Sequence, residues 1–433
     1  MSLNEKVANA TSAALSHRGI LTIAEMPQRD GRRAMEKRKG ILFAVEGLSL
    51  FGNPRTGHLI GLESDEIPLC VAYAKGKISL ESVRMANESL GRQLEEGGFD
   101  QMDEPRPRAA YLHVTQRCNL ACVGCYSCDE GRNMAADPTL GQIASALSFL
   151  AEQGVDVLNI SGGEPLMRDD LPDIAALAHE TYGIAQVNIL TNGTIGRRGI
   201  LERCAPFIHR LSVSFDGVTA DDPAWVRGAQ RFNDLVAFVG LAQDVGIEVC
   251  ITPTIHRKNV EDIPRYRALA DQLGVEVGFS LLSQTSRRWE DAGLVPTDRE
   301  LERIARLAVE AATVEGDRPI DELASGLSCR ESCGAGTSAI SIDADGSIYP
   351  CHMMHDPRFR MGNAFRGNGA TFQRMRCPPD SVPDECEECE YRYLCGAGCP
   401  ARAYGSESGR DPYCMLHKTF YGEVVRQIKE RLG

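Results

Sequence analysis

The sequence lacks any long apolar run and any excess of basic residues. No stretch approaches the roughly 20 consecutive apolar residues that cross a bilayer, and the segment Met1–Ala8 has no apolar signal core. The 433 residues carry a formal net charge of −13, whereas phosphate binding needs clustered positive charge. We therefore expect neither a membrane nor a nucleic acid as a partner.

Cysteine is nearly absent from the first hundred residues, where only Cys70 occurs, yet the whole chain has 16. Disulfide frameworks are typical of small secreted domains, so a chain of this length without a signal segment is expected in the reducing cytoplasm. There, cysteines are first considered as metal ligands or catalysts. The apolar content of 43% is enough for a sizeable core, and the length fits two or three domains.

The chain divides into three predicted regions. Strand-like residues 41–51, a turn at 55–57 and a helical pattern at 80–96 form the first, which ends at a polar, proline-containing segment. We place the domains at 1–105, 106–320 and 321–433.

The middle region alternates strands with helices, which predicts a parallel α/β architecture. In such folds catalytic groups lie on loops at the carboxyl ends of the strands. Cys118, Gly163, Asn192 and Asp216 all follow predicted strands, so we expect them at one edge of the sheet. The six predicted strands are 110–115, 155–160, 186–190, 210–215, 248–255 and 276–282.

Cys118, Cys122 and Cys125 form a Cys-x3-Cys-x2-Cys triplet after the first of these strands. The spacing suits a [4Fe–4S] cluster but provides three ligands for four irons. An incomplete ligand set marks a catalytic metal rather than a structural one. A structural zinc site is the alternative, and it lacks a fourth Cys or His at finger-like spacing.

The triplet, with the Gly162-Gly-Glu-Pro165 and Thr191-Asn-Gly-Thr194 segments, resembles the radical S-adenosylmethionine (SAM) superfamily over about residues 110–285. The resemblance implies a partial (β/α)6 TIM-type barrel in which the open iron chelates SAM and a 5′-deoxyadenosyl radical abstracts hydrogen. Asn192 and Ser214 are alternatively loop caps, and Arg227 either reaches SAM or begins a surface helix. Carried over, the cofactor-binding residues are Tyr126, Gly162, Gly163, Glu164, Asn192, Ser214 and Asp216.

Nine cysteines lie from position 329 to position 414, and seven of them resemble the SPASM extension, which holds two auxiliary [4Fe–4S] clusters. A zinc ribbon is the alternative. Cys329 is expected as a fourth ligand of the nearer cluster, but its short spacing to Cys333 leaves an open iron as a second possibility. By the resemblance, Cys333, Cys351 and Cys399 ligate the nearer cluster, and Cys386, Cys389, Cys395 and Cys414 the farther one.

Local patterns add two expectations. Residues 340–342 and 348–349 around Asp345-Gly346 predict a hairpin that positions Cys351. Cys204 and Cys250 lie in apolar patterns and are expected to be core thiols, while Cys128 and Cys377 are considered bystanders.

SPASM enzymes mostly act on peptides, and residues 1–105 resemble a small winged-helix-like peptide-recognition domain. Such domains bind a leader peptide by adding a strand to a sheet edge; a plain structural extension is the alternative. The leading hypothesis is a peptide maturase that installs a thioether or carbon–carbon crosslink in a ribosomally made precursor, with flavodoxin or ferredoxin as electron donor.

Two other functions were weighed. Relatives that oxidise Cys or Ser to formylglycine carry an Asp directly after the cysteine matching Cys351, where this chain has His352. A non-catalytic multi-cluster electron carrier would not need the Gly-Gly-Glu-Pro segment. The general base is not assigned, and His352, Asp222 and Tyr126 are all candidates.

Overall fold

The computed structural model describes residues 39–101, 106–127, 131–228, 231–283, 293–313, 326–369 and 383–432. Cys128, Cys377 and much of the expected linker between the first two regions lie outside these residues. Within the described residues, no helix combines the length and the apolar character needed to cross a bilayer.

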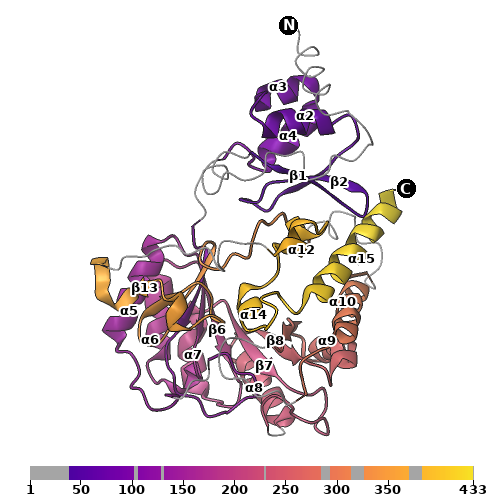
Figure 1. The fold of residues 1–433 in the computed structure, drawn as a ribbon. Helices are drawn as coiled ribbons and strands as arrows, with labels where there is room; N and C mark the ends of the chain where they lie inside the picture. Colours follow the sequence, from indigo (N-terminus) through magenta and orange to yellow (C-terminus); the bar gives the residue numbers. More distant parts are fainter. Residues whose placement is uncertain are drawn as a thin grey trace.

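The N-terminal unit is a three-stranded antiparallel sheet covered by three helices (Figure 1). Both edge strands of this sheet pair with the central strand alone among the described residues. The elements are β1 (Ile41–Val45), β2 (Leu48–Gly52), β3 (Leu59–Gly61), α2 (Ile67–Ala74), α3 (Leu80–Ala86) and α4 (Glu88–Glu96).

The helix predicted over 80–96 is two helices, because Asn87 interrupts it. Asn87 adopts an extended backbone with φ of −147°, and its side chain accepts a hydrogen bond from the Leu90 amide at 2.9 Å as the N-cap of α4. The two helices cross closely at Gly91, where a Cβ would lie 2.6 Å from the Cβ of Arg84.

The N-terminal sheet is buried on both faces. Phe51 and Ile60 pack into a core with α2, α3 and α4. The alternate residues Phe43 and Leu50 face the other way, into a second core with C-terminal residues such as Leu394. We call this second core the junction core; it consists of Ile41, Phe43, Val45, Leu50, Cys329, Leu394, Tyr421 and Val425.

The central sheet has the order β10-β8-β7-β6-β5-β4-β11-β12-β13, and β4 to β8 are all parallel. Five of the six predicted strands form as expected. The sixth is split, because Gly278 and Phe279 separate two short strands that each pair with β8. The strands of the middle region are β4 (Ala109–His113), β5 (Val157–Ser161), β6 (Gln186–Thr191), β7 (Arg210–Phe215), β8 (Glu248–Ile255), β9 (Glu276–Val277) and β10 (Ser280–Leu281).

Helices cover one face of this sheet, which carries the largest core (Figure 1). Cys204 and Cys250 are buried, as predicted for core thiols. The helices are α5 (Leu140–Glu152), α6 (Leu171–Ala176), α7 (Arg198–Cys204), α8 (Phe232–Asp244), α9 (Ile263–Leu273) and α10 (Asp298–Thr313).

The side chains that alternate with this core line the opposite face, which we call the polar face. Strand register places His113 beside Ser161 and Ser214 beside Thr252. Strands of closed parallel barrels usually fill their interior with branched apolar residues. A polar interior is instead suited to binding a polar ligand.

The predicted hairpin is β11 (Ala339–Ile342) and β12 (Ser347–Tyr349). Its strand β11 pairs in parallel with β4, so the C-terminal region extends the central sheet. Gly346 turns the hairpin with φ of +82°, a conformation that glycine adopts without strain. The remaining elements are β13 (Gly362–Asn363), α12 (Asp384–Glu387), α13 (Arg392–Cys395), α14 (Pro400–Tyr404) and α15 (Cys414–Leu432).

Candidate functional site

The cysteine triplet lies on the loop after β4, at the carboxyl edge of the sheet. Gly124 makes the turn between Cys122 and Cys125 with φ of +67°. The three thiols are close enough that the charges of Cys125 and Cys118 help raise the pKa of Cys122 to about 11, although burial is the larger cause. The structure thus brings together the three thiols that the sequence predicted.

Positive and N–H groups surround the triplet, as an anionic cluster requires. The Arg132 Nη1 lies 3.4 Å from the Cys125 Sγ, and the Asn192 Nδ2 lies 3.9 Å from the Cys118 Sγ. The Arg227 charge opposes the effect of burial on the Cys122 pKa. Cations and hydrogen bonds to sulfur favour thiolates, so these residues fit a [4Fe–4S] cluster.

Gly162 and Gly163 let the segment after β5 pack directly against the residues before Cys118. The Gly163 amide donates to the Thr115 carbonyl, and the Glu164 amide to the Arg117 carbonyl, both at 2.8 Å. A Cβ on Gly163 would overlap the Arg117 carbonyl oxygen, and Gly162 has a φ of +129°. The glycines therefore fix the position of the triplet loop.

Glu164 is fully buried, and its carboxylate joins the loop after β5 to the loop after β6. Its carboxylate accepts hydrogen bonds from the Thr191 hydroxyl and the Asn192 amide at 2.7 Å, and from the Leu166 amide at 3.0 Å. Burial raises its pKa, against the lowering effect of these donors. Glu164 thus holds the loop after β6, including Asn192, beside the cysteine triplet.

Asp216 forms a buried ion pair with Arg227. Its other oxygen accepts the Arg227 amide at 3.0 Å. Arg227 therefore lies inside the site rather than at the start of a surface helix. Ser214 lies two residues before Asp216, on the polar face.

Aromatic rings connect the triplet loop to Cys351. Tyr126 is half-buried and directly follows Cys125, and the centroids of its ring and the His352 ring are 4.8 Å apart. His352 in turn lies 4.1 Å from the Tyr111 ring, and its Nδ1 is 3.7 Å from the Cys351 Sγ. Burial lowers the pKa of His352 to about 3, so this ring is neutral at physiological pH.

A histidine–carboxylate cluster beside these rings was not predicted. Asp343 lies between His113 and His355, with N–O distances of 3.3 and 3.1 Å, and all three are buried. The His355 Nε2 also contacts the Ser341 hydroxyl at 2.7 Å. The pKa of Asp343 is lowered by both histidines despite its burial. The alternation of Tyr111 with His113 in β4 was the one sequence signal for this cluster.

The four thiols expected at the farther auxiliary cluster lie together. Burial is the first cause that raises the pKa of Cys386 and of Cys414; Cys414 and Cys389 add to the rise at Cys386, and Cys389 adds to the rise at Cys414. At Cys395, burial raises the pKa, and hydrogen bonds from the backbone amides of Gly398 and Ala397 oppose this rise. Residues 396–398 all have positive φ, and successive amides in such a loop make an anion-binding concavity.

Three of the four thiols expected at the nearer auxiliary cluster lie together. Cys399 helps raise the pKa of Cys333, after burial, and packs with Cys351 in one small cluster. Asp411 accepts the Cys399 amide at 2.7 Å and pairs with Arg402. Cys329 lies elsewhere, in the junction core.

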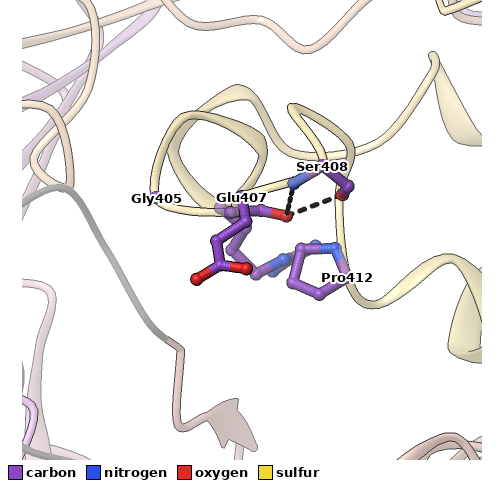
Figure 2. Close-up of a pocket in the computed structure, with 6 residues that line it drawn as sticks. Gly405, Glu407, Ser408 and Pro412 are labelled. Atoms are coloured by element: carbon purple, nitrogen blue, oxygen red, sulfur yellow. Dashed lines mark hydrogen bonds between the residues drawn. The ribbon is translucent and has the colours of Figure 1, made fainter.

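A polar surface pocket lies between α14 and α15 (Figure 2). Ser406 contributes to its lining, and the hydroxyls of Ser406 and Ser408 are hydrogen-bonded at 2.8 Å. The pocket contains none of the candidate SAM-binding residues, and its one link to the site above is Arg402, which pairs with Asp411. Its lining residues are Arg402, Gly405, Ser406, Glu407, Ser408 and Pro412.

Two family models match the chain. The model described as the radical SAM superfamily matches residues 112–270. The model described as an iron–sulfur cluster-binding domain, SPASM, matches residues 333–390. The first contains the cysteine triplet and every candidate SAM contact, and the second contains Cys333 and Cys351.

Curated relatives align over most of their own length. The AdoMet-dependent heme synthase of Methanosarcina barkeri is 27% identical over 71% of this chain and 96% of its own. The PqqA peptide cyclase of Gluconobacter oxydans is 27% identical over 75% of this chain and 94% of its own. The mycofactocin maturase MftC of Mycobacterium ulcerans is 28% identical over 70% and 86%.

Solved structures share the fold at low sequence identity. Native anSMEcpe with bound AdoMet, which is SAM, matches with a TM-score of 0.61 and 16% identity, covering 75% of this chain and 100% of that one. Streptococcus suis SuiB bound to its precursor peptide SuiA matches with a TM-score of 0.57 and 16% identity, covering 87% and 98%. These likenesses show the fold.

Proposed function

This chain is a radical SAM enzyme with a SPASM domain, and we propose that it matures a ribosomally made precursor peptide by installing a thioether or carbon–carbon crosslink. Its cofactors are SAM, a SAM-binding [4Fe–4S] cluster and auxiliary clusters. When bound, these groups supply a 5′-deoxyadenosyl radical for hydrogen abstraction and an acceptor for the electron that the substrate loses.

The role of the protein's own residues is to bind and orient these cofactors. Glu164, held by three donors, fixes the loop that carries Asn192 beside the triplet. Tyr126, next to Cys125, and His352, next to Cys351, are in ring contact, and we propose that these rings limit the access of water between the two sites. We propose that the sheet curves as a partial (β/α)6 barrel and that SAM lies against its polar face.

The N-terminal sheet carries the proposal of a peptide substrate. The match to SuiB covers 87% of this chain, more than residues 106–433 can supply, so it includes part of the N-terminal unit. The unit offers an edge strand, β3, that pairs only with β2 among the described residues. Peptides bind such edges by adding a strand. We propose that residues 1–105 are a winged-helix-like domain that binds the leader there.

Two competing functions are less well supported than peptide crosslinking. A tetrapyrrole is favoured by the name of the M. barkeri relative, but that match covers 71% of this chain and needs nothing from the N-terminal unit. Formylglycine formation is the other, and the residue after Cys351 is His352, an imidazole with a pKa lowered to about 3, rather than a carboxylate. An electron donor such as flavodoxin or ferredoxin and a cytoplasmic location complete the proposal.

Leader binding is tested at Gly61, which lies in β3 with open space where a Cβ would be added. A lysine there places charge and bulk on the edge without a clash, a device that blocks edge pairing. Gly61→Lys is expected to weaken binding of a precursor peptide, encoded beside this chain's gene, by at least about tenfold, or 1.4 kcal/mol. Formation of 5′-deoxyadenosine without peptide should be unchanged.

Gly199→Lys is the matched control, because Gly199 lies in α7 with equally open space. Fluorescence anisotropy of a labelled peptide measures both variants. Equal peptide affinity in the Gly61 variant and the control would rule out leader binding at β3.

A further inference from the structure

The thiol of Cys329 is built into the contact between the N-terminal sheet and the C-terminal region. Cys329 is 1% exposed and belongs to the junction core. A Cβ added at Gly52 would overlap its sulfur and would lie 2.7 Å from its Cβ. The glycine at the end of β2 therefore leaves the space that this side chain fills.

The backbone around Cys329 is fixed on both sides. Its amide donates to the Gly57 carbonyl of the N-terminal unit at 2.8 Å. The next amide, of Arg330, donates to the Tyr393 carbonyl in α13 at 2.7 Å. The segment is thus held between two parts of the molecule, with its thiol directed to Gly52.

The surroundings of Cys329 differ from those of the other candidate ligands. Burial and the Glu331 charge raise its pKa to about 12, and none of the thiols in the described parts of the chain is among the causes. The pKa of Cys333 is instead raised in part by Cys399, and the pKa of Cys395 is raised in part by Cys389 and Cys386. Cys329 packs among the apolar side chains of the junction core, whereas Cys351 and Cys399 pack together in a different cluster.

We propose that Cys333, Cys351 and Cys399 are the only cysteine ligands of the nearer auxiliary cluster, and that Cys329 is a structural residue of the junction core. The fourth position is then left for an external ligand. Resting on the proposed function, the ligand class is a thiolate or carboxylate of the precursor peptide; a thiol would release its proton to solvent on binding.

Iron content tests the ligand set without SAM, peptide or turnover. Three clusters hold about 12 irons. Cys329→Ala is expected to retain that number after anaerobic reconstitution and desalting, whereas Cys351→Ala should fall to about 8. Loss of about four irons in the Cys329 variant would overturn the proposal.

The open position is tested in a variant with Cys118, Cys122 and Cys125 all replaced by Ala, which removes the SAM-binding cluster. Labelled cyanide (13C) is expected to add a hyperfine coupling to the EPR signal of the reduced auxiliary clusters. Absence of coupling would contradict the proposal. So would a coupling that appears only after Cys377→Ala, since Cys377 would then be the fourth ligand.

The structural role of Cys329 is tested by exchanging side chains across the junction. Gly52→Ala is expected to lower the melting temperature by several degrees, because its methyl overlaps Cys329. Adding Cys329→Gly should restore at least half of that loss at unchanged iron content. An additive loss in the double variant would refute the packing role. All three measurements remain valid even if no peptide is crosslinked.

Discussion

At the scale of single residues, the Glu164 carboxylate joins the loops after β5 and β6. Replacing it with Gln puts an amide group where three donors converge, so one donor loses its acceptor. Leaving a buried donor unsatisfied costs about 1–3 kcal/mol. We expect Glu164→Gln to lower stability by this amount and to weaken SAM binding, measured by anaerobic thermal unfolding and equilibrium dialysis.

Glu180→Gln controls for this change, because Glu180 is exposed. Its effect on stability should stay within about 0.5 kcal/mol. If both variants unfolded at the same temperature as the parent, the hydrogen bonds of Glu164 would not support the site.

His256 gives the fold a defined pH dependence. Burial lowers its pKa from 6.5 to about 4, and its Nδ1 accepts the Lys258 amide at 3.2 Å, which requires the unprotonated ring. Because the folded pKa is depressed, the stabilisation is present above pH 6.5 and is lost as the pH falls toward 4. The loss at pH 5.5 is about 1–1.5 kcal/mol.

The measurement is the difference in melting temperature between pH 7.5 and pH 5.5 for the parent and for His256→Gln. We expect a smaller difference in the variant, since Gln does not titrate. An identical pH dependence in both proteins would show that this ring is not the group responsible.

Single residues were also where the sequence was least informative. The spacing of Cys118, Cys122 and Cys125 predicted that these thiols meet, because neighbouring positions in one loop are close in any fold. The auxiliary sets join distant segments and came from the resemblance to the SPASM extension. It did not place Cys329, because the position of that thiol depends on Gly52, which is 277 positions away in the sequence. The cluster of His113, Asp343 and His355 depends similarly on the pairing of β4 with β11.

At the scale of elements, the loop between α13 and α14 has three successive residues of positive φ, a geometry that suits an anion such as cluster sulfur. Gly398 has a φ of +85°, and a Cβ there would lie 2.6 Å from the Cβ of Asp411. Gly398→Ala is expected to displace Asp411 and lower the iron content of the auxiliary sites, as measured by iron and sulfide analysis. Strain at positive φ adds about 1–2 kcal/mol.

Gly409→Ala separates strain from the clash, because Gly409 has a φ of +66° with nothing near its missing Cβ. This variant should lose stability but keep its iron. Equal iron loss in both variants would attribute the effect to backbone strain alone.

Secondary structure followed the sequence where hydrophobic periodicity was strong. The parallel strands β4 to β8 alternate regularly and were predicted. The split of α3 from α4 was not, because an N-cap by Asn87 in mid-pattern competes with an uninterrupted apolar stripe. The sixth strand was overestimated for a similar reason, since an apolar run does not reveal the break at Gly278.

At the scale of the whole molecule, the N-terminal unit is part of a continuous structure. Its sheet shares the junction core with α13 and α15, so deletion of residues 1–105 would expose apolar surface on the C-terminal region. Point variants at the β3 edge therefore separate peptide binding from stability better than truncation does.

The central claim is that the radical made by this protein abstracts hydrogen from a peptide. The most direct measurement uses a precursor peptide carrying deuterium at its aliphatic carbons, incubated anaerobically with reconstituted protein, SAM and a strong reductant. The account predicts deuterium in the 5′-deoxyadenosine and a peptide product that has lost two hydrogens. Formation of 5′-deoxyadenosine without deuterium, and with the peptide unchanged, would contradict it.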